Sequence, residues 1–80
     1  MNTSKLWVNN EKRRYYRVLV YKDLLGDLIS MRQWGSLETA RGGSKVELVD
    51  GAEAVARLLG GIAKQRLKRG YNLTDDTKNQ

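Results

Sequence analysis

Apolar and aromatic residues are concentrated at residues 14–22, whose sequence is RYYRVLVYK. This composition is typical of a strand, and the length of the segment suits a strand better than a helix. Tyr16, Val18 and Val20 share one face of that strand, whereas Leu19 lies on the other face. Because neither face is purely polar, we expect both faces to contact other groups.

Residues 28–34, LISMRQW, form a second predicted strand. A glycine-containing turn at residues 24–27 joins it to the first strand, so the pair predicts an antiparallel hairpin. A polar loop at residues 35–43 then leads to a third predicted strand at residues 44–49, in which charged and apolar residues alternate. Residues 6–8 fit a further short strand.

Residues 51–69 have the apolar spacing of an amphipathic helix. One narrow stripe of this helix contains Val55, Leu58, Leu59 and Ile62. Asp50 and Glu53 have the spacing of a capping box at the start of the helix, and Gly70 suits a left-handed C-cap at its end. We therefore expect the helix to lie on the sheet with its apolar stripe inward.

Two glycines, Gly60 and Gly61, interrupt this helix and cost it about 1 kcal/mol each relative to alanine. Neither lies on the apolar stripe, so packing against the sheet does not account for them. After the helix, Tyr71 and Leu73 are placed to return to the sheet. Residues 74–80, TDDTKNQ, have the composition of a disordered tail.

Three strands followed by a helix predict an α+β fold, a small twisted antiparallel β-sheet with one α-helix packed on one face. We expect residues 1–73 to form this single domain, because a chain of 80 residues has no room for a second. The chain has no cysteine and no histidine, so we expect no metal site and no cofactor. It has neither the apolar run of a signal peptide nor a segment that could cross a bilayer, so we expect a cytoplasmic protein without a membrane partner.

The formal net charge of +6 is concentrated in two segments. Residues 12–22 and 57–69 together contain ten basic residues and no acidic one, whereas the rest of the chain contains five basic and nine acidic residues. A concentrated positive charge favours an anionic partner.

Few features of the sequence favour catalysis. The carboxylates near a turn, Asp23 and Asp27, have no histidine to pair with, and neither do Asp75 and Asp76. The run GGSK at residues 42–45 resembles part of a phosphate-binding loop, but its spacing is wrong and a strand follows it instead of a helix. We therefore expect that the protein is not an enzyme.

The order of these segments resembles the WGR domain, a family named for a Trp-Gly-Arg signature. The resemblance rests on RYYRVLVYKDLLGDLISMRQWGS, then SKVELVD after a short loop, and KRGY at the end of the helix. The resemblance covers about residues 6–73. Over this range the chain is similar to small bacterial members of the family that consist of little else. The family is best known from poly(ADP-ribose) polymerases, where the domain helps to recognise DNA ends.

By that resemblance, Trp34 would stack on a terminal sugar of nucleic acid, and Arg14 would contact backbone phosphate. Tyr71 would lie near the DNA end, and DNA would be favoured over RNA as the ligand. Ser36 stands where the signature has arginine. In the polymerases that arginine links the DNA to neighbouring domains, so its replacement counts against a signalling role more than against binding.

Taken without the resemblance, Trp34 fits either an exposed stacking platform or an aromatic residue that covers the edge of the core, and Trp7 is assigned to the core. The basic residues around the hairpin fit either a surface that follows phosphates or a solvated surface: Arg14, Arg32, Arg41 and Lys45. Arg32 lies two residues from Trp34 and so shares its strand face. The helix cations opposite the stripe are interpreted as a solvated face: Arg57, Lys64 and Lys68.

The function favoured by these observations is a non-enzymatic module that binds nucleic acid without reading its sequence, because no base-reading element is recognisable. The alternative is an adaptor whose sheet face binds another protein, with the positive surface speeding association with an acidic partner. Tyr15, Leu19 and Tyr21 on the second face of the first strand favour that alternative. The sequence gives no indication of the oligomeric state.

Overall fold

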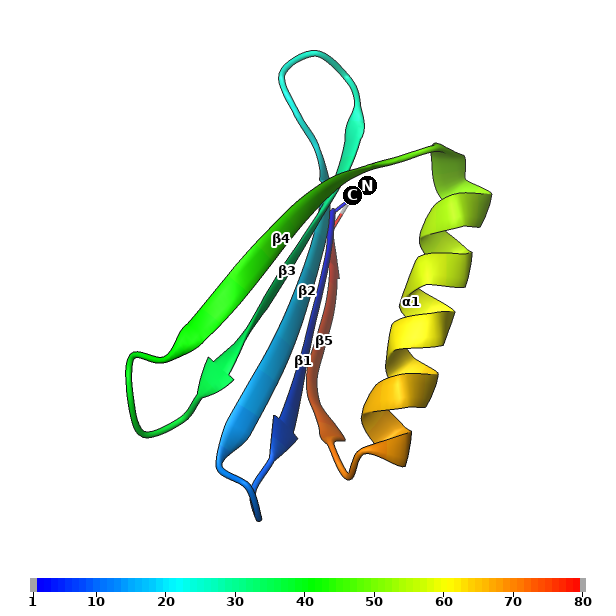
Figure 1. Cartoon of the computed structure of the whole chain (residues 1–80). Coiled ribbons are helices and arrows are strands. Elements are labelled where there is room, and N and C mark those ends of the chain that lie inside the picture. Colours follow the sequence, from blue (N-terminus) through cyan, green and yellow to red (C-terminus); the bar gives the residue numbers. More distant parts are fainter. Residues whose placement is uncertain (1, 80) are drawn as a thin grey trace.

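The computed structural model describes residues 2–79, which form one five-stranded antiparallel sheet and one helix (Figure 1). The elements in chain order are β1 (Asn2–Asn9), β2 (Arg14–Lys22), β3 (Leu28–Ser36), β4 (Gly42–Val49), α1 (Gly51–Lys68) and β5 (Asn72–Asn79). The order of strands in the sheet is β4-β3-β2-β1-β5, and α1 lies against one face. The predicted α+β fold is confirmed. No helix of the described part is long and apolar enough to cross a membrane.

The hydrophobic core lies between α1 and the sheet. Trp7 of β1 is buried there together with Val18 and Val20 of β2, and Val55 and Ile62 of α1 close the core from the other side. Leu58 and Leu59 are partly buried against the same cluster, so the predicted apolar stripe of the helix is confirmed. The assignment of Trp7 to the core is also confirmed.

The strand register places Tyr16, Trp34 and Gly43 on the helix side of the sheet. Tyr16 of β2 pairs with Trp34 of β3, which in turn pairs with Gly43 of β4. Because directly paired residues of antiparallel strands point to the same face, these residues share the face that carries Val18 and Val20. The opposite face carries Val46 and Leu48, whose exposed fractions are 57% and 74%.

The β3–β4 hairpin extends into the segment predicted to be a loop, because β3 continues to Ser36 and β4 begins at Gly42. Glycine permits this close pairing. A Cβ atom on Gly42 would overlap the carbonyl oxygen of Trp34, and one on Gly35 would lie 2.5 Å from the carbonyl oxygen of Arg41. The irregular part of the connection is thereby reduced to residues 37–41.

The predicted disordered tail is wrong for residues 74–79, which belong to β5; residue 80 lies outside the described residues. β5 pairs with β1 over the length of that strand, and Lys5 Nζ of β1 lies 3.0 Å from Asp76 Oδ1. A polar sequence without alternation gives no signal for a strand. Residues 72–77 are exposed, so this part of the strand is held by its antiparallel pairing with β1 and not by burial of its side chains.

The predicted capping box is also wrong, because the side chain of Asp50 makes no capping hydrogen bond. Gly51 follows it with a φ of +89°, so the chain enters the helix in a conformation that does not aim the Asp50 carboxylate at the first turn. At the other end, Gly70 has a φ of +85°, which confirms the predicted left-handed C-cap. Gly60 and Gly61 are exposed and nothing in the structure explains them.

Candidate functional site

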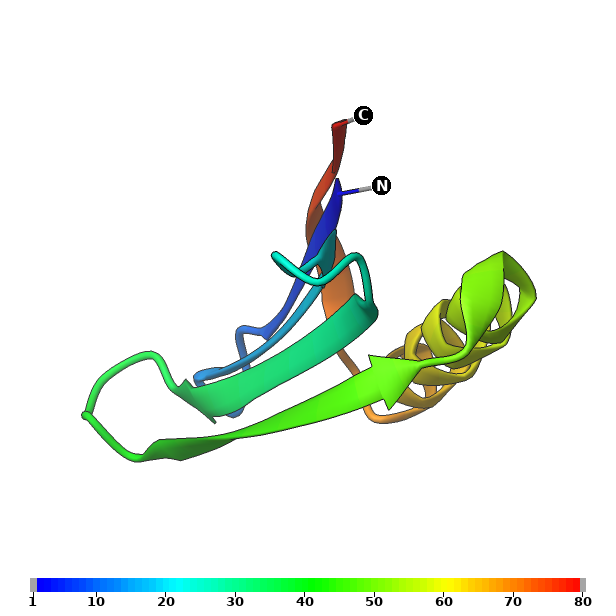
Figure 2. The same cartoon turned by 90° about the horizontal axis from the view of Figure 1, so that it is seen from above.

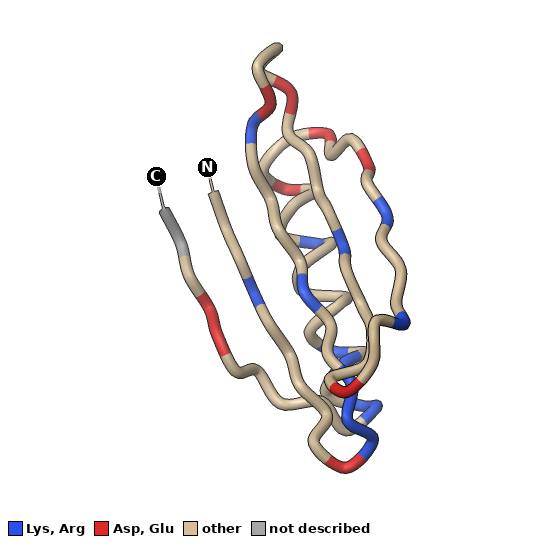
Figure 3. Tube along the Cα trace, turned by 90° about the vertical axis from the view of Figure 1, so that its left-hand side faces the viewer, with Lys and Arg blue, Asp and Glu red and all other residues tan. Residues whose placement is uncertain are grey.

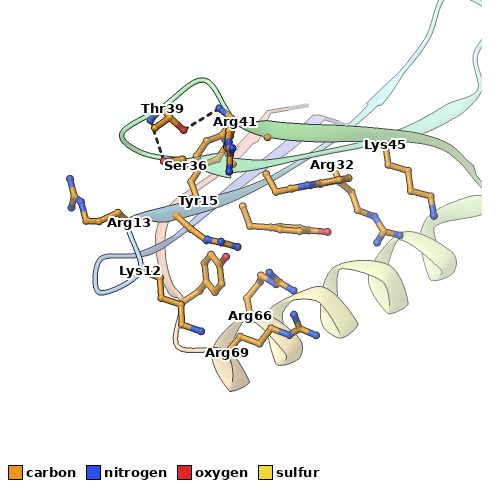
Figure 4. A pocket seen from close by; sticks show the side chains of 16 residues that line it. Lys12, Arg13, Tyr15, Arg32, Ser36, Thr39, Arg41, Lys45, Arg66 and Arg69 are labelled. Carbon is orange, nitrogen blue, oxygen red and sulfur yellow. Dashed lines mark hydrogen bonds between the residues drawn. The ribbon is translucent and has the colours of Figure 1, made fainter.

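A cavity of about 740 Å³ lies between the last turns of α1 and the sheet, near the β1–β2 turn and the β3–β4 hairpin. This cavity is called the basic groove (Figure 4). Its lining contains eight lysine and arginine residues, four aromatic residues and no carboxylate. Figure 3 shows basic residues gathered at the end of the molecule where α1 ends. The lining residues are 12–16, 32, 34–36, 39, 41–42, 45, 66, 69 and 71.

All six residues singled out from the sequence line the basic groove: Arg14, Arg32, Trp34, Arg41, Lys45 and Tyr71. They come from β2, β3, the β3–β4 loop, β4 and the segment after α1, so the fold brings together positions that are up to 57 residues apart in sequence. The helix cations Arg57, Lys64 and Lys68 do not line the groove and are exposed, as predicted for a solvated face.

Two carboxylates neutralise part of this charge from the rim of the groove. Glu47 lies 2.7 Å from Arg32 and 3.7 Å from Lys45, and Glu38 lies 3.1 Å from Arg13. Within residues 2–77, the other five cations of the groove make no ion pair with a carboxylate: Lys12, Arg14, Arg41, Arg66 and Arg69. The groove therefore has an unneutralised positive potential that favours an anionic ligand.

Sequence reasoning missed several groove residues, and Arg66 is the most buried of the missed cations. It is only 9% exposed, and its guanidinium carbon lies 4.2 Å from the ring centroid of Tyr16 and 4.9 Å from that of Tyr71. Its Nε is buried and has no hydrogen-bond partner among the described residues. Contact with two aromatic rings fixes the guanidinium at the floor of the groove, since each cation–π contact contributes about 0.5–2 kcal/mol.

The signal for Arg66 was present in the helical spacing. Arg66 follows Ile62 by four residues, so it continues the apolar stripe of α1 beyond the aliphatic core. A cation on an inward stripe needs a partner inside the fold, and here the partners are two tyrosines.

Trp34 continues an aromatic series that begins in the core. The Trp7 and Tyr16 rings meet edge to face at 6.4 Å between centroids, and the Tyr16 and Trp34 rings stack at 6.2 Å with an interplanar angle of 16°. Trp34 as a whole residue is 38% exposed. A Cβ on Gly43 would lie 2.9 Å from that indole, so the glycine leaves the space that the ring occupies over β4.

Hydrogen bonds between three segments hold the helix end in place beside the groove. The Asn9 side-chain amide donates to the carbonyl of Arg69 at 3.2 Å, and its oxygen accepts the Lys12 N–H at 2.9 Å. The N–H of Tyr71 donates to the carbonyl of Arg66 at 2.9 Å, and the N–H of Gly70 donates to that of Leu67. This Schellman motif turns the chain back so that the Tyr71 ring reaches the Arg66 guanidinium.

Ser36 has a structural role in the β3–β4 loop. Its hydroxyl oxygen accepts hydrogen bonds from the backbone N–H groups of Glu38 at 3.0 Å and Thr39 at 3.2 Å, and Figure 4 shows the one from Thr39. The loop also has a hydrogen bond from the Arg41 N–H to the Thr39 hydroxyl at 3.2 Å. These contacts order the segment that carries Arg41 into the groove.

The protein was compared with protein-family models, curated proteins and solved structures, and none of them matches this chain. The geometry of the basic groove therefore carries the functional argument.

Proposed function

We propose that this chain is a WGR-like module that binds nucleic acid in the basic groove without reading its sequence and without catalysing a reaction. The observation that carries the proposal is a single groove with eight cations, four aromatic residues and no carboxylate in its lining. Cations that neutralise phosphates release counterions and so supply affinity that does not depend on base sequence. A cytoplasmic location, where nucleic acid is accessible, belongs to the same proposal.

In this proposal the aromatic residues and the cations have different tasks. The exposed part of the Trp34 indole offers a surface on which a base or sugar of a strand end stacks. Arg14 and Arg41, which flank the groove without ion pairs within residues 2–77, bind the adjacent phosphates. Arg66 at the floor adds a guanidinium whose position is set before the ligand arrives. DNA is favoured over RNA by the resemblance to the WGR family.

The test is fluorescence anisotropy of labelled blunt, nicked and single-stranded DNA at low and high salt, with the wild type and Trp34→Ala. We expect Trp34→Ala to weaken binding by roughly 5- to 150-fold, because base–aromatic stacking contributes about 1–3 kcal/mol. Leu67→Ala is the matched control, since this exposed helix residue does not line the groove. Unchanged affinity in a Trp34→Ala protein that remains folded would exclude the stacking role.

A protein-binding adaptor is the second candidate. The face opposite the helix exposes Val46 and Leu48, and Leu19 and Tyr21 lie on the same face. In this alternative the basic groove only attracts an acidic partner. A folded wild type that binds none of the DNA probes at low salt would favour the adaptor.

A further inference from the structure

The sheet has two edges, β4 and β5, and they differ in how they are protected. An edge strand presents unpaired backbone N–H and C=O groups, which other strands can join unless charge, proline or a covering segment prevents it. β5 carries the adjacent carboxylates Asp75 and Asp76. β4 is eight residues long, contains no proline, and runs along one margin of the molecule (Figures 1 and 2).

The side chains of β4 are compatible with pairing rather than opposed to it. Val46 and Leu48 are 57% and 74% exposed on the face away from α1. The only charged residues of the strand are Lys45 and Glu47, which have opposite signs and lie two residues apart on the helix side. The strand itself thus has no net charge, although the whole chain carries +6.

We propose that β4 is a pairing site for β4 of a second copy of this chain, joined antiparallel about a twofold axis at Val46. In this register Lys45 lies opposite Glu47 of the second copy, and Glu47 lies opposite its Lys45. The same strand surface is thus self-complementary in charge, as a twofold interface requires. Val46 lies opposite Val46 of the second copy, and the backbone groups of both edges become paired.

This inference does not rest on the proposed function, although Lys45 also lines the basic groove, because it uses the free edge of β4 and its test measures self-association without nucleic acid. A twofold axis perpendicular to the sheet keeps both helices on one side of the resulting ten-stranded sheet. The two basic grooves would then open on the same side, since each lies on the helix face of its own sheet.

The first test is sedimentation equilibrium of the full chain up to millimolar concentration. The wild type is expected to approach twice its mass of 9.1 kDa. Lys45→Glu and Glu47→Lys should each weaken self-association by about tenfold, because each places like charges opposite one another. An equimolar mixture of the two variants restores opposite charges at both positions and should associate as the wild type does.

Two results would overturn the proposal. One is a wild type that keeps the mass of a single chain at every concentration. The other is a pair of variants that self-associate as strongly as the wild type, or whose mixture associates no better than each alone. Neither outcome depends on nucleic acid, so it is distinct from a failure of the proposed function. Circular dichroism verifies that each variant is folded.

Disulfide trapping tests the register, because the chain contains no cysteine of its own. Val46→Cys places two thiols opposite each other on the axis, at a separation that a disulfide can bridge, so mild oxidation should give a covalent dimer. Leu48→Cys is the matched control. In the proposed register Leu48 lies opposite Ser44 of the second copy, so the two introduced thiols are about 13 Å apart along the strand direction. Equal trapping of both variants would refute the register.

Discussion

Replacing Arg14 by glutamine removes one of the five groove cations that make no ion pair within residues 2–77. If each of the five binds one phosphate of a duplex, the slope of log K against log salt is about −4.5, since each neutralised phosphate contributes about −0.9. Between 50 and 200 mM salt the affinity should then fall about 500-fold. Arg14→Gln should reduce the slope to about −3.6 and the loss to about 150-fold.

The assay is fluorescence anisotropy with a short blunt duplex at four or more salt concentrations. Arg57→Gln is the control, because Arg57 is exposed on α1 and does not line the basic groove. In the opposite direction, Glu47→Gln frees Arg32 and Lys45 and should steepen the slope, by up to about 1.8. The electrostatic reasoning fails if the wild-type slope is near zero, or if Arg14→Gln and Arg57→Gln alter it equally.

Two further predictions concern the free energy of unfolding, which is measured by urea denaturation. Asn9→Ala removes the hydrogen bonds to Arg69 and Lys12 and should lower the free energy of unfolding by about 1–3 kcal/mol. Gly60→Ala and Gly61→Ala should each raise the free energy of unfolding by about 1 kcal/mol, because an added Cβ meets no atom within 4 Å at either position. A loss of stability in these alanine variants would show that the helix conformation there requires glycine.

The parts of the fold that the sequence predicted are those with strong periodicity. The aromatic and β-branched composition of residues 14–22 identified β2, although not which of its faces is inward, and the spacing of Val55 and Ile62 identified the buried side of α1. Burial of apolar surface produces such patterns directly, so they are visible without the structure.

The parts that were mispredicted depend on pairing with residues distant in sequence or on backbone geometry that the residue pattern does not show. β5 is polar in sequence and exposed over residues 72–77, and it forms a strand because it pairs with the edge of β1. The prediction of a helix cap at Asp50 was wrong because the local residue pattern does not reveal the positive φ of Gly51. These features are decided by backbone geometry and tertiary pairing, which single-residue preferences do not contain.

The candidate site also contains residues that the sequence predicted and residues that it did not. The resemblance and the charge pattern selected six residues, and the fold places all of them in one groove. Their roles in binding remain predictions. Arg66 was missed because it was counted as one of many cations, and only the fold brings Tyr16 and Tyr71 around it.

The unneutralised groove also has a consequence for the folding equilibrium of the free chain. Five cations held near one another repel, so the empty protein is less stable than its packing alone would make it. Added salt should stabilise the free chain by screening this repulsion, while the same salt should weaken the binding of a polyanion. A polyanion at 100 times its Kd would in turn stabilise the native state by about 2.7 kcal/mol through thermodynamic linkage. If the groove binds a polyanion as proposed, folding and occupancy of the groove are coupled, and the amount of native protein in a cell would depend on the anions around it.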